Sequence, residues 1–293
     1  MKMKRLIYEV AGHCFALNIA ETEDVVGQLA QYEPFQVADD GGKGFVFELD
    51  VVPPEEFPAS EGYVEETTQD DDGTQISAGR DGGRPYFDFL LRGVRASRLM
   101  TNDSYDHGVT TLEGNREFGL NNALMVMYAL STSNLQTALF HSSVIGYQGR
   151  GYMFLGKSGT GKSTHSGLWL KYIEGTELLN DDNPVVRFVD GEPWVFGSPW
   201  SGKTPCYRNV KAPLGAIVRL SQAPYNKIRP LKGIEAYAVL VPSISGKRWD
   251  KRLAEGLHET ENLLAERARM FHLECLPDEA AARTCLEAVT EGL

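Results

Sequence analysis

The stretch Gly156-Lys157-Ser158-Gly159-Thr160-Gly161-Lys162-Ser163 lies between an apolar run at 152–155 and an amphipathic segment at 164–173. It matches the pattern G-x-x-x-x-G-K-[ST] in full. In such a P-loop, glycines let successive backbone N–H groups turn inward around an anion, and the helix that begins there adds the positive end of its dipole. We therefore expect a strand, a phosphate-binding loop and a helix in this order.

The side chains of the loop indicate which groups it binds. Lys162 is expected to reach the β- and γ-phosphates of ATP or another nucleoside triphosphate, and Ser163 to offer its hydroxyl to Mg²⁺. The residues expected to surround the nucleotide are Gly156, Lys157, Ser158, Gly159, Thr160, Gly161, Lys162, Ser163 and Thr164.

The residues before the loop predict how the chain reaches it. The spacing of apolar residues predicts a helix over 120–132 that leads into the domain. Residues 139–147 alternate as a strand, 148–151 favour a turn, and 152–155 form a second strand. Most P-loop folds deliver this second strand through a crossover helix, so a hairpin narrows the choice of fold.

Two consecutive carboxylates follow the loop. Asp181 and Asp182 come at the end of the short apolar strand predicted around 178–179. In P-loop enzymes a carboxylate at a neighbouring strand end holds the metal ion, directly or through water. One carboxylate is enough for that task, so a second can accept the proton of an attacking hydroxyl. The alternative is a surface turn, because the surrounding residues also favour turns.

In order and spacing, the hairpin that carries His141, the loop at 156–163 and the pair Asp181-Asp182 resemble the HPr kinase/phosphorylase and phosphoenolpyruvate carboxykinase superfamily. The resemblance covers residues 120–290 and implies an α/β (α+β) P-loop kinase core of the HPr kinase/carboxykinase type. It also implies Asp181 as the catalytic base, Asp182 as a metal ligand and His141 as a helper beside the phosphates. The two aspartates could exchange these roles.

The chain departs from the superfamily after these residues. The Glu-Ile-Arg-Gly-type signature that helps its kinases bind a protein substrate is replaced by Phe196-Gly197-Ser198-Pro199-Trp200-Ser201-Gly202-Lys203-Thr204. Glycines and serines make this segment able to approach anionic oxygens, and Lys203 is expected to stabilise charge on the transferring phosphoryl group. The additional histidine and lysine ligands of the carboxykinases are not evident. HPr and oxaloacetate are therefore disfavoured as substrates.

The residues before 119 predict a different kind of domain. Short alternating runs recur there and are separated by glycine- and aspartate-rich turns typical of hairpins. The predicted strands are 6–10, 14–19, 45–51, 63–68, 75–78 and 86–91. We expect an antiparallel β-rich N-terminal domain over 1–118 and the HPr-kinase-like nucleotide-binding domain over 119–293.

Composition limits the partners of the protein. The chain has 293 residues, 42% of them hydrophobic and 24% charged, with a formal net charge of −11. Nucleic acid and anionic membranes reward a basic surface, so neither is expected as a partner. The four cysteines are scattered, which favours reduced thiols. No signal peptide or membrane-length apolar run is evident, and a cytoplasmic protein is expected.

These observations predict an ATP- and Mg²⁺-dependent kinase that transfers the γ-phosphate to a hydroxyl. The acceptor would be a serine of a protein or peptide, or a small hydroxyl compound. One alternative is a non-catalytic nucleotide sensor, which needs only the P-loop and one carboxylate. A carboxykinase-like enzyme acting on a small acid is a further alternative. Whether the chain assembles into a homo-oligomer stays open.

Overall fold

The computed structural model describes residues 2–71, 73–202 and 204–291. The chain divides into two compact units, Met1–Ser131 and Thr132–Leu293. Among the described residues each unit contains one nine-stranded sheet. The helix predicted at 120–132 belongs to the first unit, whereas the sequence analysis assigned it to the second. Lys203, predicted to be catalytic, lies outside the described residues.

The first unit consists mainly of strands. Its elements in chain order are β1 (Met3–Val10), β2 (His13–Ala20), η1 (Val26–Gln28), η2 (Ala30–Phe35), β3 (Gln36–Val37), β4 (Phe45–Val51), β5 (Tyr63–Asp71), β6 (Thr74–Asp81), β7 (Arg84–Leu91), β8 (Val94–Thr101), β9 (His107–Leu112) and α1 (Arg116–Ser131). Strands β8 and β9 were not predicted. Their small and polar residues, such as Ser97 and Thr110, are buried, so no polar–apolar alternation marks them.

The first sheet has the order β3-β1-β2-β4-β9-β8-β7-β6-β5. Its hairpins use two-residue turns such as Gly82-Gly83 and Arg92-Gly93, in which both residues have positive φ, as type I′ turns require. The sheet is mixed rather than purely antiparallel, because β4 runs parallel to both β2 and β9. The connections before and after β4 are long enough for such crossovers, whereas a hairpin turn is not.

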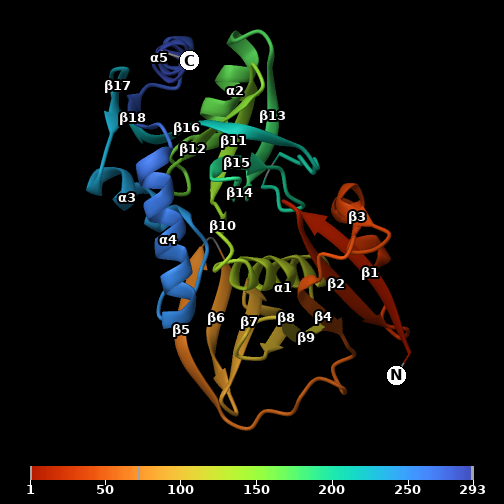
Figure 1. Cartoon of the computed structure of the whole chain (residues 1–293). Coiled ribbons are helices and arrows are strands. Elements are labelled where there is room, and N and C mark those ends of the chain that lie inside the picture. Colours follow the sequence, from red (N-terminus) through yellow and green to blue (C-terminus); the bar gives the residue numbers. More distant parts are fainter. Residues whose placement is uncertain (1, 72, 203, 292–293) are drawn as a thin grey trace. The chain divides into compact units, whose positions relative to one another are not determined.

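One face of this sheet is covered by α1 (Figure 1). The helix comes close to β8: a Cβ on Gly119 would lie 2.6 Å from the carbonyl oxygen of Ala96, and Ser97 Oγ donates to the Gly119 carbonyl at 3.0 Å. Leu120 and Leu124 of α1 are fully buried. The apolar core of the first unit therefore lies between α1 and the sheet.

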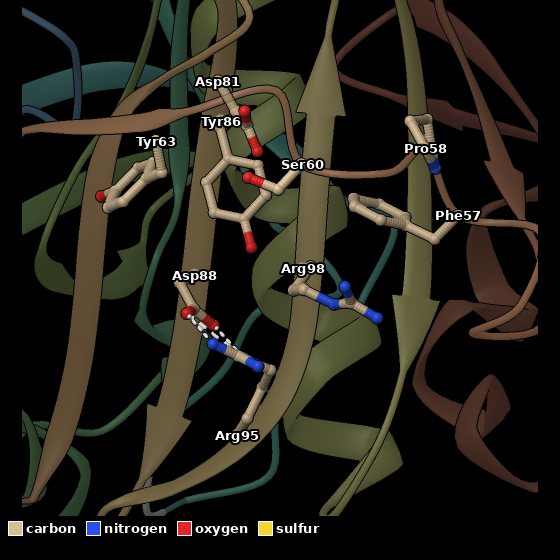
Figure 2. Close-up of a pocket in the computed structure, with 9 residues that line it drawn as sticks. All are labelled: Phe57, Pro58, Ser60, Tyr63, Asp81, Tyr86, Asp88, Arg95 and Arg98. Carbon is tan, nitrogen blue, oxygen red and sulfur yellow. Dashed lines mark hydrogen bonds and ion pairs between the residues drawn. The ribbon is translucent and has the colours of Figure 1, made fainter.

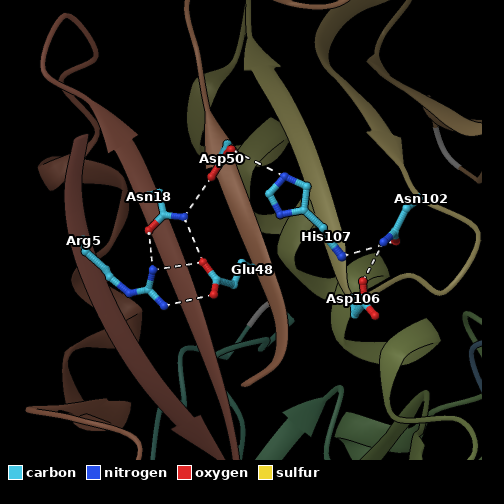
Figure 3. Close-up of polar contacts among 7 residues, drawn as sticks. All are labelled: Arg5, Asn18, Glu48, Asp50, Asn102, Asp106 and His107. Carbon is cyan, nitrogen blue, oxygen red and sulfur yellow. Dashed lines mark hydrogen bonds and ion pairs between the residues drawn. The ribbon is translucent and has the colours of Figure 1, made fainter. Parts of the chain in front are cut away.

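The other face of the sheet carries polar side chains (Figure 3). Arg5 donates two hydrogen bonds to Glu48, at 2.9 and 3.1 Å, and Asn18 donates to Asp50 at 2.8 Å. His107 lies 3.6 Å from Asp50 and continues this row. Exposed ion pairs of this kind contribute little stability each, so the row marks a solvated part of this face.

The second unit alternates strands and helices. Its elements are β10 (Thr137–Leu139), β11 (Ser142–Tyr147), β12 (Arg150–Leu155), α2 (Lys162–Tyr172), β13 (Thr176–Asp182), β14 (Val185–Val189), β15 (Glu192–Phe196), β16 (Lys211–Gln222), β17 (Lys227–Leu231), α3 (Ile234–Leu240), η3 (Val241–Ser243), α4 (Lys251–Arg267), β18 (Met270–Cys275) and α5 (Glu279–Thr290). Strand β17 and helix α3 were not predicted.

The second unit has helices on both faces of its sheet. Strand order is β10-β14-β15-β16-β12-β11-β13, and β18 joins β16 to β17. Phe154 of β12 packs in one cluster with Trp169 of α2 and residues of α5. Its neighbour Leu155 packs in the opposite cluster with Leu240 of α3 and Leu257 of α4. Alternate side chains of β12 thus enter two apolar layers, which fixes this strand in the middle of the unit.

Candidate functional site

The register of three neighbouring strands brings the predicted site residues to one edge of the second sheet. Strand β11 pairs with β12 on one side and β13 on the other, both antiparallel. Ser142 lies opposite Leu155 in β12 and opposite Asp182 in β13. The start of the predicted P-loop, the residue before Ser142 and the tandem aspartates are therefore adjacent in space, although they are far apart in the sequence.

The predicted P-loop connects β12 to α2. Gly159 and Gly161 have φ values of +77° and +106°, which side chains other than glycine rarely adopt. Gly161 precedes the first helical residue at the N-cap position and, as a glycine, has no side chain to cap the first turn. Lys162 Nζ donates to the carbonyl oxygen of Gly156 at 3.0 Å, so the ammonium lies over the loop. This turn can therefore offer backbone donors and a cation to an anion.

Ser163 contacts the first aspartate. Its hydroxyl donates to Asp181 Oδ1 at 3.0 Å, and Asp181 is only 3% exposed. Two neighbouring oxygen ligands of an octahedral Mg²⁺ at 2.0–2.1 Å lie about 3.0 Å apart. The oxygen pair of Ser163 and Asp181 therefore fits a magnesium ion, whereas the sequence analysis paired Ser163 with Asp182.

The second aspartate contacts the histidine. His141 Nδ1 lies 3.2 Å from Asp182 Oδ1, and Asn183 donates to Asp182 Oδ2 at 2.8 Å. Burial raises the pKa of Asp182, and the positive charges of His141 and Lys162 oppose that increase. Asp182 also has a φ of 122°, a strained conformation for a residue with a Cβ. Such strain is typical of residues held in place for function.

His141 lies in a break between two strands, β10 and β11, that the sequence did not predict. The expected strand over 139–147 is divided: β10 ends at Leu139 and pairs with β14, and β11 begins at Ser142. The backbone N–H of His141 donates to the carbonyl of Ser243 at 2.7 Å instead of joining a strand. This break places the imidazole at the end of β11, beside the aspartates.

The segment after β15 holds the backbone of the aspartates. Gly202 N and Ser201 Oγ both donate to the carbonyl oxygen of Asp181, at 2.5 and 3.0 Å. Ser201 also forms an isolated bridge with Asp182. The sequence analysis expected this segment to approach anionic oxygens. Ser201 and Gly202 of this segment contact the peptide groups of Asp181 and Asp182 and so support the strained φ, while the expected approach to anionic oxygens stays a prediction.

Buried polar residues also hold the backbone around the two aspartates in place. Asn180 Nδ2 donates to Ser198 Oγ at 3.2 Å, and Ser198 Oγ donates to the carbonyl oxygen of Asn183 at 2.5 Å. Both side chains are fully buried. Sequence reasoning missed these residues. The available signal was an asparagine directly before the two aspartates, together with small residues in a loop that follows an apolar strand.

Buried side-chain contacts hold the helix after the loop, α2, against the sheet. Ser166 and Ser143 share a buried hydrogen bond of 2.6 Å between α2 and β11. Trp169 Nε1 donates to His165 Nε2 at 3.2 Å, and burial lowers the pKa of His165 to about 4. His165 is therefore neutral at physiological pH. These contacts fix the first turn of α2, and with it Ser163, against the sheet.

The described residues form no larger cluster of metal-binding side chains. Within residues 2–71, 73–202 and 204–291, no group of three or more histidine, cysteine, aspartate or glutamate side chains could hold a metal ion. Mg²⁺ usually takes one or two protein carboxylates and keeps several waters, so this result does not conflict with the pair of Ser163 and Asp181.

Comparison with known proteins leaves the site geometry as the main guide to function. No protein-family model matches the chain, and a search of the curated proteins finds no match. Among the described residues, no helix combines the length and the apolar character needed to cross a bilayer.

Proposed function

We propose that this chain is an ATP- and Mg²⁺-dependent kinase that transfers the γ-phosphate to a hydroxyl group. The observation that carries the proposal is the convergence of three features at one sheet edge. These are the loop that ends at Lys162, the Ser163–Asp181 hydrogen bond and the His141–Asp182 contact. Nucleotide binding alone requires the first two features, and the third adds a group able to accept a proton.

The contacts favour an exchange of the roles first assigned to the aspartates. Asp181 and Ser163 would hold Mg²⁺, which when bound neutralises charge on the phosphates. Ser163 bonds to Asp181, whereas Asp182 lies beside His141, so Asp182 is the better candidate for the base. Its raised pKa makes its carboxylate a stronger proton acceptor than an ordinary aspartate.

The proposed transfer uses the residues of this chain as follows. Asp182 accepts the proton of the acceptor hydroxyl while the oxygen of that hydroxyl forms a bond to the γ-phosphorus. The bond from that phosphorus to the bridging oxygen of the nucleoside diphosphate breaks, and the diphosphate leaves. Lys162 and the loop N–H groups stabilise the negative charge on the phosphoryl oxygens. His141 holds the carboxylate of Asp182 in position through its Nδ1 atom.

The acceptor is proposed only by class: a hydroxyl of a protein, a peptide or a small molecule. The test is transfer of label from γ-labelled ATP, with Mg²⁺, into a cell extract whose macromolecules and small molecules are then separated. Lys162→Ala is the inactive variant. Lys171→Ala, an exposed lysine of the same helix, is the matched control.

Label in either fraction with the wild type and Lys171→Ala, and its loss with Lys162→Ala, supports the kinase and identifies the acceptor class. ATP binding by the wild type without any transfer of label contradicts the kinase. That result favours a nucleotide sensor instead.

A further inference from the structure

The first unit contains a pocket of about 260 Å³ on the side of its sheet away from α1 (Figure 2). Ser97 of β8 faces α1, so its neighbour Arg98 points to the other side, together with Tyr86 of β7. Phe57, from the segment between β4 and β5, closes the pocket on one side. The floor is a small apolar cluster that includes Phe57, Tyr86 and Met100.

One end of the pocket is lined by two arginines, each paired with a carboxylate. Arg98 donates from Nε to Glu113 at 2.9 Å, and its guanidinium lies 4.6 Å from the centre of the Phe57 ring. Arg95 donates from Nε and Nη2 to Asp88, at 2.8 and 2.7 Å. Within the described part of the chain, neither the Nη atoms of Arg98 nor Nη1 of Arg95 makes a hydrogen bond. These donors remain for a ligand.

Tyr86 adds a further donor at this end. Its side chain is 8% exposed, and burial raises the pKa of its phenol to about 12, so the hydroxyl keeps its proton at neutral pH. The hydroxyl points into the pocket between Asp88 and Arg98 (Figure 2). No other described residue forms a hydrogen bond with it. The ring of Tyr86 is buried whereas its hydroxyl is open to the pocket, so a ligand or water there can complete its hydrogen bond.

The other end of the pocket is acidic. Asp81, at the end of β6, is 3% exposed, and its Oδ1 accepts the backbone N–H of Glu61 at 2.8 Å. Its Oδ2 accepts no hydrogen bond from the described residues. Figure 2 shows this carboxylate beside Ser60, above the ring of Tyr86. A cationic group that enters the pocket at this end would meet a buried carboxylate.

We propose that this pocket binds a small zwitterion, such as a free amino acid or a dipeptide. Its carboxylate accepts hydrogen bonds from Arg98 and Tyr86, its ammonium donates to Asp81, and its carbon chain lies over the aromatic floor. The lining contains two arginines and two aspartates, and Glu113 is paired with Arg98, so the pocket offers no excess of positive charge to an anion, whereas a zwitterion brings no net charge. The proposal does not depend on the kinase function.

Calorimetric titration of the full chain tests this inference. The probes are serine, lysine, glutamate, tyrosine and glycylglycine, each compared with its N-acetyl derivative and its methyl ester. At least one zwitterion is expected to bind, with both blocked forms at least 10-fold weaker because each removes one of the two charged contacts.

Three variants locate the binding. Asp81→Asn keeps an acceptor for the Glu61 N–H, Tyr86→Phe removes only a hydroxyl, and Arg98→Gln removes the cation. Each is expected to weaken binding at least about 5-fold. Arg84→Gln, an exposed position of β7, and Lys162→Ala should bind like the wild type.

Absence of binding by every probe at millimolar concentration overturns the proposal. Binding that tolerates the blocked termini overturns it too, as does binding that tolerates all three pocket substitutions or that is lost in Lys162→Ala. Thermal unfolding of each variant, with a midpoint close to that of the wild type, shows that weaker binding is not caused by misfolding.

Discussion

The hydroxyl of Ser163 donates a hydrogen bond of 3.0 Å to Oδ1 of Asp181 and joins the first turn of α2 to the end of β13. The two consecutive aspartates therefore have different partners. Asp181 belongs to the side of the site where a phosphate-bound metal ion would lie, and Asp182 belongs to the side of His141. Adjacent residues on a strand point to opposite faces, so two such neighbours can serve different tasks.

The two aspartates are expected to respond differently to removal of their charge. Asp182→Asn should lower the rate of phosphoryl transfer by about 10²- to 10⁴-fold, because the general base is lost. Nucleotide affinity should stay within about 3-fold of the wild type, since Asp182 does not hold the phosphates. Rates measured with labelled ATP and affinities measured with a fluorescent nucleotide check this prediction.

Asp181→Asn is the matched comparison. It should raise the Mg²⁺ concentration needed for half-maximal activity by at least about 10-fold, because a carboxylate ligand becomes a neutral amide. Equal magnesium dependence in the two variants would contradict this division of roles.

His141 is expected to act by positioning Asp182. His141→Ala should lower kcat about 10-fold with little change in KM, because the imidazole contacts the carboxylate at 3.2 Å. His141→Asn places an N–H donor near the position of Nδ1 and should recover part of the rate. Steady-state kinetics of both variants are the measurement. If the asparagine variant is as slow as the alanine variant, a hydrogen bond to Asp182 is not what His141 supplies.

Gly197 should tolerate no side chain. A Cβ at this position would lie 2.0 Å from the carbonyl oxygen of Arg208, so one of the two backbone segments must move. Gly197→Ala is expected to destabilise the second unit by about 2–4 kcal/mol and to displace the segment that holds Asp181. Urea unfolding followed by circular dichroism measures this change.

The control for that change is Gly167→Ala on the exposed side of α2. A Cβ there has no neighbour within 4 Å, and alanine favours a helix over glycine by about 1 kcal/mol. This variant should be as stable as the wild type or more stable. A similar loss of stability in both variants would mean that the approach of Arg208 to Gly197 is not the cause.

Tyr8 is expected to make the first unit sensitive to alkaline pH. Burial, with a smaller contribution from Glu33, raises the pKa of Tyr8 from 10.0 to about 12. The unfolded chain therefore loses the phenolic proton first, so the stabilisation is complete below pH 10 and is lost as the pH rises toward 12. Relative to Tyr8→Phe, the wild type should lose about 1–2 kcal/mol over this range.

Unfolding free energies of the wild type and Tyr8→Phe at pH 8 and pH 11 test this prediction. The difference between the two proteins cancels the titration of the other tyrosines. A difference that is the same at both pH values would show that the folded state does not hold this phenol neutral.

The sequence was most informative where a structure depends on neighbouring residues. The loop from Gly156 to Ser163 lies between a strand and a helix as predicted, because its glycines allow positive φ values and its flanks have the right periodicity. The hairpin turns of the first unit were predictable for the same reason. Strands β8 and β9 were missed, since their burial comes from α1 and the segment between β4 and β5, which their own residues do not encode.

Only the tertiary structure decided which partners the site residues have. The sequence alone predicted a P-loop, a carboxylate pair at the end of a strand and a histidine upstream of the loop. The register of β11 against β12 and β13 then brought Asp181 to Ser163 and Asp182 to His141. The physical reason is the separation in sequence of the interacting residues. Turns and helix starts follow from adjacent residues, whereas strand register and side-chain contacts depend on the packing of segments far apart in the chain.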